Sequence, residues 1–295
     1  MKRVDFHGIE CVELGNDRLS LLATASVGPR ILSLTPASGE NLFAELPDAT
    51  LDCPGVGPFH FYGGHRLWHA PEVPSITYLP DDAAVNVTEM ANGLRLTQDV
   101  EPRTSLQKQL EIRLAQHGSA VEVRHILWNR GEREHALAPW AITQLRPGGV
   151  AILPQSTNSI DDGSILPNRS ITFWPYTDIN ERTISWGNRT ILVRAQMVAG
   201  KFKIGFPNPA GWMAYWWNGF LFVKRAGYDC GADYLDHGSS SECYCDARFL
   251  ELETLGPVTR LLPGERIEHV EEWRVETGLP GTDDLEGILS VIASG

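Results

Sequence analysis

The feature that most constrains the fold of this chain is a repeated alternation of apolar and polar residues in short runs. In Leu106–Leu114, leucine and isoleucine fall on one side, while glutamine, glutamate and arginine fall on the other. A period of two residues is that of a half-buried β-strand, since successive side chains point to opposite faces. Similar runs recur at 19–23, 94–100, 121–128, 191–196, 212–217, 220–225, 248–254 and 267–275. Their short spacing predicts an all-β fold with antiparallel strands.

Helix signals are scarce, and the clearest is at 283–293. Asp283 and Glu286 resemble a helix-capping pair, and apolar residues at 285, 288, 289 and 292 form one stripe. The segment at 163–188 is rich in Asn, Ser, Trp and Pro, which predicts long loops or irregular edge strands. Because no repeat, low-complexity tract or linker divides the chain, we predict one domain over residues 1–295. Its two large antiparallel sheets pack together, with a short C-terminal helix.

Charge and composition exclude several classes of function. The net charge is -12, whereas nucleic-acid binding and binding to anionic membranes need a basic surface. No run approaches eighteen apolar residues, and the first residues lack the apolar region of a signal peptide. Five cysteines, an odd number, are read as reduced thiols. These observations predict a cytoplasmic protein that binds neither nucleic acid nor membrane.

The stretch FHFYGGHRLWHAPE at 59–72 concentrates chemically active residues. His65, Arg66 and Glu72 offer donors, acceptors and a group that titrates near neutral pH, and Trp68 adds an aromatic ring. The alternative interpretation is a surface loop with satisfied polar side chains. His65 and His69 have the spacing of metal ligands on a helix, but the Gly-Gly pair and the nearby proline disfavour a helix there. We expect no metal and no cofactor.

A second candidate is the pair of glutamates in the run FLELET. Alternation puts Glu251 and Glu253 on one face, roughly 7 Å apart along a strand, and Leu250 and Leu252 on the other. In a cleft, these carboxylates can serve as a general base and a hydroxyl-binding partner. The alternative is a solvated strand face, although paired like charges repel unless a ligand or cation lies between them.

Aromatic and amide side chains suggest the type of ligand. Trp140 and Gln144 share a face, and a flat ring beside amide donors suits a sugar, whose C–H faces stack on aromatic rings. A core tryptophan is the competing interpretation of Trp140. His125 falls on the apolar face of its run, which predicts a satisfied core histidine. Motifs for nucleotide binding, for serine hydrolases and for zinc proteases are absent from the sequence.

The order of these features resembles the galactose mutarotase superfamily over essentially the whole chain. Residues 30–34 and 39–43 resemble its early hairpin, and residues 63–66 resemble its active-site segment with Gly-Gly and histidine. The closing features are Leu-Pro-Gly-Glu at 262–265 and Glu-Trp at 272–273. The motif GGHRLWxAPE is similar to that of a bacterial branch of the superfamily. The resemblance implies a β-supersandwich that binds a small-molecule sugar or sugar derivative.

The resemblance also implies roles for particular residues. In the family, a glutamate takes the proton from the anomeric hydroxyl and a histidine protonates the ring oxygen, so that the ring opens and recloses. These roles correspond to Glu251 or Glu253 as the base and His65 as the acid. The resemblance makes Arg66 a partner for a hydroxyl or the ring oxygen. Glu72, Trp68, Trp140 and Gln144 are the other candidate substrate contacts, taken from the residue patterns above.

One departure from the family keeps other functions open. A second family histidine is missing from the segment APWAI at 138–142. We therefore predict an aldose 1-epimerase-like mutarotase, with a non-catalytic carbohydrate-binding or sensing protein as the alternative. A relative of glycoside hydrolases or lyases is a third interpretation.

Overall fold

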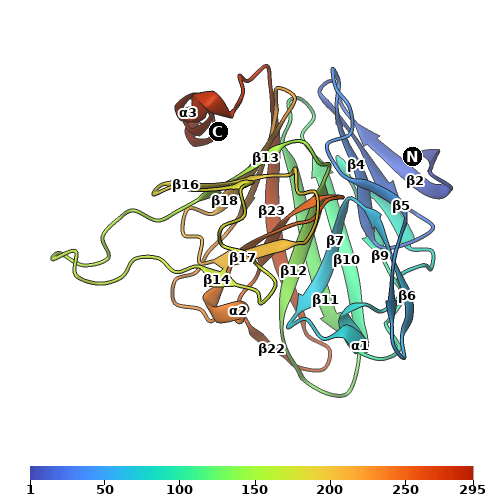
Figure 1. Ribbon diagram of the computed structural model, residues 1–295. Coiled ribbons are helices and arrows are strands. Elements are labelled where there is room, and N and C mark those ends of the chain that lie inside the picture. Colours follow the sequence, from blue (N-terminus) through green and yellow to red (C-terminus); the bar gives the residue numbers. More distant parts are fainter. Residues whose placement is uncertain (295) are drawn as a thin grey trace.

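The computed structural model describes residues 1–294, and most of its regular structure is β-strand, as the alternation predicts. Two large sheets pack face to face, and their strand pairs are antiparallel (Figure 1). The first sheet runs in the order β1 (Lys2–Phe6), β2 (Ile9–Gly15), β3 (Leu19–Thr24), β4 (Arg30–Pro36), β7 (His65–Ala70), β12 (His135–Leu145), β21 (Leu250–Leu255), β20 (Ser241–Cys245), β17 (Phe202–Phe206) and β14 (Thr172–Phe173), and β22 (Thr259–Leu261) pairs with β12.

The second sheet contains the remaining long strands of the sandwich. Its order is β15 (Ile184–Trp186), β16 (Thr190–Arg194), β13 (Val150–Pro154), β18 (Trp212–Trp217), β19 (Phe220–Ala226), β23 (Arg266–Thr277), β11 (Val121–Asn129), β10 (Leu106–Leu114), β9 (Gly93–Thr97) and β8 (Asn86–Met90). A separate hairpin consists of β5 (Glu45–Cys53) and β6 (Gly57–Gly63). The segment from 155 to 171, between β13 and β14, leaves the body as a long loop (Figure 1).

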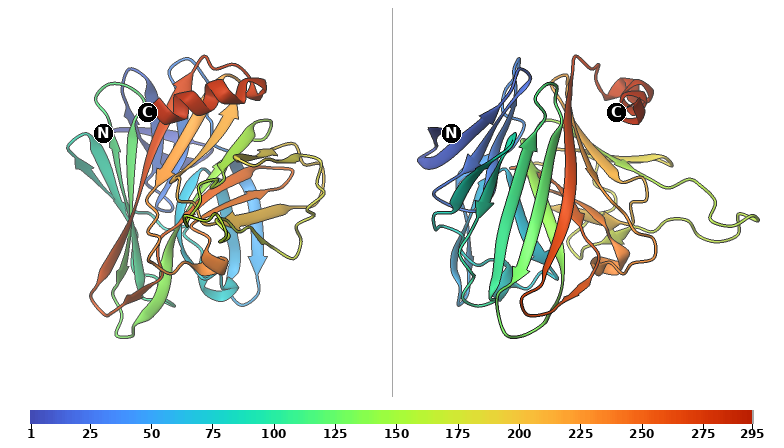
Figure 2. Two further views of the ribbon diagram at one scale, coloured as in Figure 1. Left: turned by 90° about the vertical axis from the view of Figure 1, so that its left-hand side faces the viewer. Right: turned by 180° about the vertical axis from the view of Figure 1, so that it is seen from behind.

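Helices are a minor part of the structure. They are α1 (Pro74–Thr77), α2 (Leu235–Gly238), the 3-10 turn η1 (Thr282–Asp284) and α3 (Leu285–Ser294). The predicted C-terminal helix is thus present, and Ile288 and Ile292 of its apolar stripe pack on Leu221 and Val223 of β19. Figure 2 shows α3 lying across the outer side of the second sheet. Among residues 1–294, none of the helices has the length and apolar character needed to cross a membrane.

The main core lies between the two sheets. Phe43, Phe222 and Trp273 meet edge to face at its centre, with ring centroids 5.6–6.0 Å apart. Leu250 and Leu252 of β21 belong to this core. Because side chains alternate along a strand, Glu251 and Glu253 point away from the core, as their pattern predicts.

The stretch at 59–72 is not a surface loop, because most of it belongs to β6 and β7. Gly63 and Gly64 join the two strands, with φ of +93° and +69°. A Cβ atom on Gly64 would lie 2.1 Å from the carbonyl oxygen of Ile31, and one on Gly63 would lie 1.9 Å from that of Ala44. Gly64 therefore allows the start of β7 to pack closely against β4, and Gly63 allows the end of β6 to approach the backbone at Ala44.

Replacing Gly64 with alanine is expected to lower the free energy of unfolding by about 3 kcal/mol or more. The substitution adds a side chain at positive φ and forces a backbone collision at Ile31. Urea denaturation measures the loss. Gly118→Ala is the matched control, because Gly118 also has positive φ (+86°) but a Cβ there meets nothing within 4 Å. Equal losses in the two variants would contradict the close-approach argument.

Candidate functional site

A cleft of about 300 Å³ lies on the face of the first sheet that points away from the main core. Strands of the first sheet form its floor, with Arg66 from β7, Trp140 from β12, Glu251 from β21 and, beyond β20, Lys203 from β17. Aromatic side chains from the β5–β6 hairpin, the α1 region and the loops around β14 line its walls, and charged side chains also border it. These lining residues are Phe61, Trp68, Glu72, Tyr78, Trp174, Tyr176, Lys201, Tyr244, Arg248 and Phe249.

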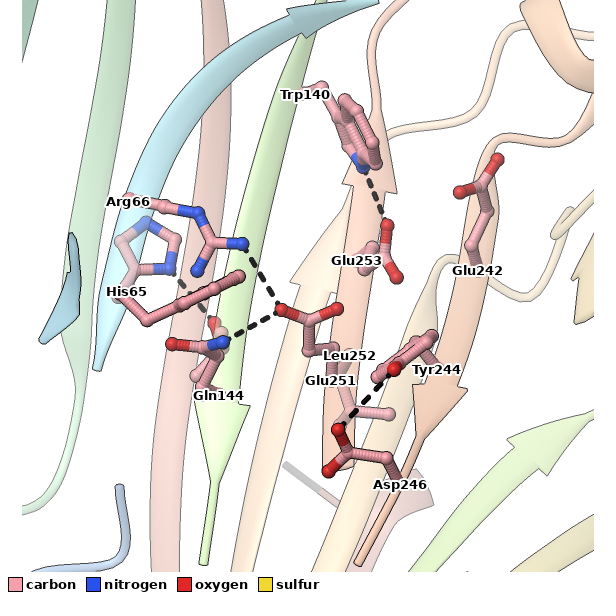
Figure 3. A network of polar contacts seen from close by, with 12 residues as sticks. His65, Arg66, Trp140, Gln144, Glu242, Tyr244, Asp246, Glu251, Leu252 and Glu253 are labelled. Atoms are coloured by element: carbon pink, nitrogen blue, oxygen red, sulfur yellow. Dashed lines mark hydrogen bonds and ion pairs between the residues drawn. The ribbon is translucent and has the colours of Figure 1, made fainter. Parts of the chain in front are cut away.

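Glu251 is the acidic group at the centre of the cleft floor. Its Oε1 atom accepts hydrogen bonds from Arg66 Nη2 at 3.1 Å and Gln144 Nε2 at 3.0 Å (Figure 3). Burial raises the pKa of Glu251 to about 7; Arg66 opposes this shift and the neighbouring Glu253 adds to it. A carboxyl group with this pKa is populated in both protonation states near neutral pH, which suits general acid–base chemistry.

Glu253 points to the same side of β21 as Glu251 but is fully buried beneath the lining of the cleft. Its Oε2 atom accepts hydrogen bonds from the Trp140 indole at 2.7 Å and from Lys203 Nζ at 2.9 Å. The same ammonium lies 2.7 Å from Glu242, which stands directly opposite Glu253 on β20. Burial alone would lower the pKa of Lys203, but Glu242 and Glu253 outweigh it and raise that pKa well above its usual value. Lys203 is the cation that allows two acidic side chains to face each other.

Aromatic rings and cations alternate across the floor. The rings of Trp68 and Trp140 lie 5.4 Å apart, and the guanidinium of Arg66 lies 4.2 Å from the centre of the Trp68 ring. Lys203 Nζ lies 4.7 Å from the ring centres of both Trp140 and Trp174. Within residues 1–294, Arg66 Nε, Arg66 Nη1 and Glu253 Oε1 are buried without a hydrogen-bond partner. A buried polar atom without a partner costs free energy, so the polar groups at and beneath the floor are not fully satisfied within the protein.

His65 does not share this cleft, contrary to the expectation that it converges with the two glutamates. Arg66 and Trp68 of β7 line the cleft, so the neighbouring His65 points to the other face, between the sheets, where it is fully buried. Its Nδ1 atom lies 2.8 Å from Thr143 Oγ1 and its Nε2 atom lies 2.6 Å from His125 Nε2. Burial lowers the pKa of His65 well below its usual value. A direct role as the acid in the cleft is therefore wrong.

The hydrogen-bond partners assign the proton positions in this buried cluster. His125 Nδ1 donates to the carbonyl oxygen of His269 at 2.9 Å, so His125 Nε2 is the acceptor for His65 Nε2–H. His125 is thus a satisfied core histidine, as its position on an apolar face predicts. Burial lowers the pKa of His125 and lowers that of His269 to about 3. The three imidazoles are neutral at physiological pH.

The same cluster contains the atom types of a metal site, since ligand atoms of His65, His125 and Glu271 lie within 4.8 Å of one another. Two nitrogen ligands on a tetrahedral zinc ion lie about 3.3 Å apart. The two Nε2 atoms are only 2.6 Å apart, which is a hydrogen-bond distance, and Lys224 Nζ lies 2.8 Å from the Glu271 carboxylate. An ammonium beside the carboxylate repels a divalent cation. This geometry favours a proton, not a metal ion, between the two imidazoles.

The structure brings most of the remaining candidates together. Arg66, Trp68, Glu72, Trp140 and Glu251 line the cleft, and Gln144 bonds the carboxylate of Glu251. Sequence reasoning missed Lys203, Tyr176 and Tyr244 among other lining residues. The one available signal was a lysine inside the otherwise apolar run FKIGF at 202–206, because a buried lysine needs an acidic partner.

No family model and no curated protein sequence matches the chain. Solved structures do share its fold. A putative aldose 1-epimerase from Klebsiella pneumoniae aligns with a TM-score of 0.63 at 11% identity, covering 97% of this chain and 84% of that one. A galactose mutarotase-like protein from Lactobacillus casei gives 0.59 at 12%, covering 90% and 100%. A putative mutarotase from Salmonella typhimurium gives 0.58 at 12%, covering 93% of each chain. The chain therefore has the fold of the galactose mutarotase-like proteins.

Proposed function

We propose that this protein is an aldose 1-epimerase-like enzyme that opens and recloses a sugar ring in the cleft. The observation that carries the proposal is the position of Glu251, an acid whose pKa is raised to about 7, on the floor of an aromatic-lined cleft. Anomer interconversion requires a group that removes and returns a proton near neutral pH. The proteins that share the fold include a putative mutarotase and a putative aldose 1-epimerase, which supports the same assignment.

The chemistry of the cleft suits a monosaccharide or a derivative of one. Its volume of about 300 Å³ is at the lower end of the range for small-molecule sites. Trp68 and Trp140 are nearly buried in the floor, and the more exposed rings of Trp174 and Tyr176 offer stacking surfaces for the C–H faces of a sugar ring. Arg66 and Lys203 offer charged donors to hydroxyl groups, and Glu72 offers an acceptor at the side.

The proton transfers can be assigned to residues of the cleft. In the proposed reaction, ionised Glu251 takes the proton of the anomeric hydroxyl, and the bond between the anomeric carbon and the ring oxygen breaks. The aldehyde forms, and the ring oxygen takes the proton back from Glu251. Rotation about the adjacent C–C bond followed by the reverse steps gives the other anomer. Lys203 stabilises the negative charge that develops on the ring oxygen, because its raised pKa keeps it an ammonium.

A carbohydrate-binding or sensing protein is the second candidate function, and the position of His65 favours it. His65 lies between the sheets, and among residues 1–294 no histidine lines the cleft to act as the imidazole acid of the family mechanism. In this alternative, the same aromatic rings and polar groups hold a sugar and no ring opening follows.

Exchange NMR on a panel of free aldoses, uronates and sugar phosphates separates the two functions. The enzyme is expected to exchange the anomers of at least one sugar faster than buffer alone, and titration should quench the fluorescence of Trp140 and its neighbours. Saturable binding with an unchanged exchange rate would replace the proposed enzyme with the binding protein. Neither exchange nor binding by any member of the panel would reject both functions.

A further inference from the structure

Lys224 connects the second sheet to the cleft floor. It lies on β19, is fully buried, and extends its side chain across the space between the sheets. Its Nζ atom lies 2.9 Å from the carbonyl oxygen of Leu252 and 3.3 Å from that of Ala141. It also lies 3.0 Å from Thr143 Oγ1 and 2.8 Å from Glu271 Oε1. Two of these four acceptors are backbone atoms of the first sheet, on its central strands β12 and β21.

These two backbone atoms belong to residues next to the cleft side chains. Leu252 stands between Glu251 and Glu253 on β21, and Ala141 follows Trp140 on β12. The ammonium of Lys224 thus holds, from behind, peptide groups next to Glu251 and Trp140, which line the cleft, and next to the buried Glu253. A strand transmits a shift of one residue directly to its neighbours, because the backbone is pleated and continuous.

The charge of Lys224 also acts on the floor. The Lys224–Glu271 pair is completely buried, and a charge in such a site is screened far less than one at the surface. Lys224 touches the residue adjacent to Glu251. Glu271 instead accepts a hydrogen bond from the hydroxyl of Thr254, which is three residues after Glu251 on β21. The positive end of the pair is therefore nearer to Glu251 than the negative end along the strand.

Other ionisable groups face Glu251 directly, and the contribution of Lys224 adds to theirs. They are Arg66 from β7, Lys203 from β17, Glu253 on the same strand, Tyr244 from β20, and Tyr78 and Tyr176 from the walls of the cleft. Lys201, Arg248 and Glu72 also border the cleft.

We propose that Lys224 is a positioning residue for the cleft, which fixes the backbone of β12 and β21 and favours the ionised form of Glu251 from behind the sheet. The effect of Lys224 on catalysis rests on the proposed function. Its effect on the ionisation of the Glu251 carboxyl group does not depend on that function. A lysine that served only the core would stabilise the fold without any effect on that ionisation.

The test is a pH titration of the Glu251 carboxyl carbon by NMR on protein labelled with ¹³C-glutamate, with Glu251→Gln identifying the signal. Lys224→Met is expected to raise the midpoint by about half a unit to one unit, because a nearby positive charge is lost. Lys224→Met combined with Glu271→Gln should raise it in the same direction but by a smaller amount, because the negative charge of Glu271 is lost as well and no unpaired charge stays in the core. The double variant decides the matter if the single variant fails to fold.

Lys108→Met is the matched control. Lys108 is also a buried lysine of the second sheet, paired with Glu101 at 2.5 Å. Its loss should destabilise the protein but leave the midpoint of Glu251 unchanged. Wild-type midpoints in both Lys224 variants would overturn the inference, as would an equal shift in Lys108→Met. The titration needs no turnover. A protein without epimerase activity would therefore reject the proposed function, while the effect of Lys224 on Glu251 could still be measured.

Discussion

Glu251→Gln is expected to slow catalysed anomer interconversion by about 100- to 10,000-fold at pH 8, which is the usual contribution of a positioned general base. Glutamine keeps the shape of the side chain but cannot take a proton from the anomeric hydroxyl. Sugar binding should weaken much less, because the aromatic rings that line the cleft are unchanged. Polarimetry measures the catalysed rate, and tryptophan fluorescence measures the affinity.

The pH profile of the wild-type protein provides a second readout of the same residue. The base acts only when ionised, and the pKa of Glu251 is raised to about 7 by burial. The rate should therefore be low near pH 5, rise through pH 7 and level off above it. Glu251→Gln should lose this rise. Glu268→Gln, on the exposed Arg124–Glu268 pair of the second sheet, is the control that should retain the wild-type profile. A Glu251→Gln protein with the wild-type rate would exclude Glu251 as the base.

Lys203→Met is expected to cause the largest loss of stability, about 3–5 kcal/mol of unfolding free energy at pH 8. The substitution leaves the carboxylates of Glu242 and Glu253 buried and facing each other without a cation. Burial already raises the pKa of Glu242 well above its usual value, and removing the ammonium raises it further.

The sign of the pH dependence follows from these shifts. Acids whose pKa is raised on folding bind protons more readily in the folded state, so stability falls as the pH rises above about 4.5. The loss in Lys203→Met should therefore be smaller at pH 5 than at pH 8, as urea denaturation at the two pH values measures. Lys201→Met, two residues away on an exposed side chain, should change stability by less than about 0.5 kcal/mol. A pH-independent loss in Lys203→Met would contradict the proposed role of the ammonium.

Local pattern determined much of the architecture. The period of two residues in runs such as Leu106–Leu114 identified strands, and the apolar stripe at 285–292 identified the terminal helix. Alternation also assigned Glu251 and Glu253 to the face away from the core, because Leu250 and Leu252 are apolar neighbours on the same strand. Such inferences succeed because they depend only on the direction in which a strand or helix presents successive side chains.

The stretch at 59–72 shows where local pattern was insufficient. Its mixture of histidines, aromatics and glycines lacks alternation, since β7 is buried on both faces and therefore carries no polar face. Once β7 is known to be a strand, the adjacent residues His65 and Arg66 must point in opposite directions. One joins the buried histidine cluster and the other joins the cleft.

The sequence by itself determined the strand faces, the terminal helix and the two glutamates that point away from the core. Only the tertiary structure decided which side chains surround those glutamates. Lys203 reaches Glu253 from 50 residues away, and Arg66 reaches Glu251 from 185 residues away. These contacts depend on the order in which strands pair within the first sheet. That order is set by long-range packing between the sheets, whereas the period of a run depends only on neighbouring residues.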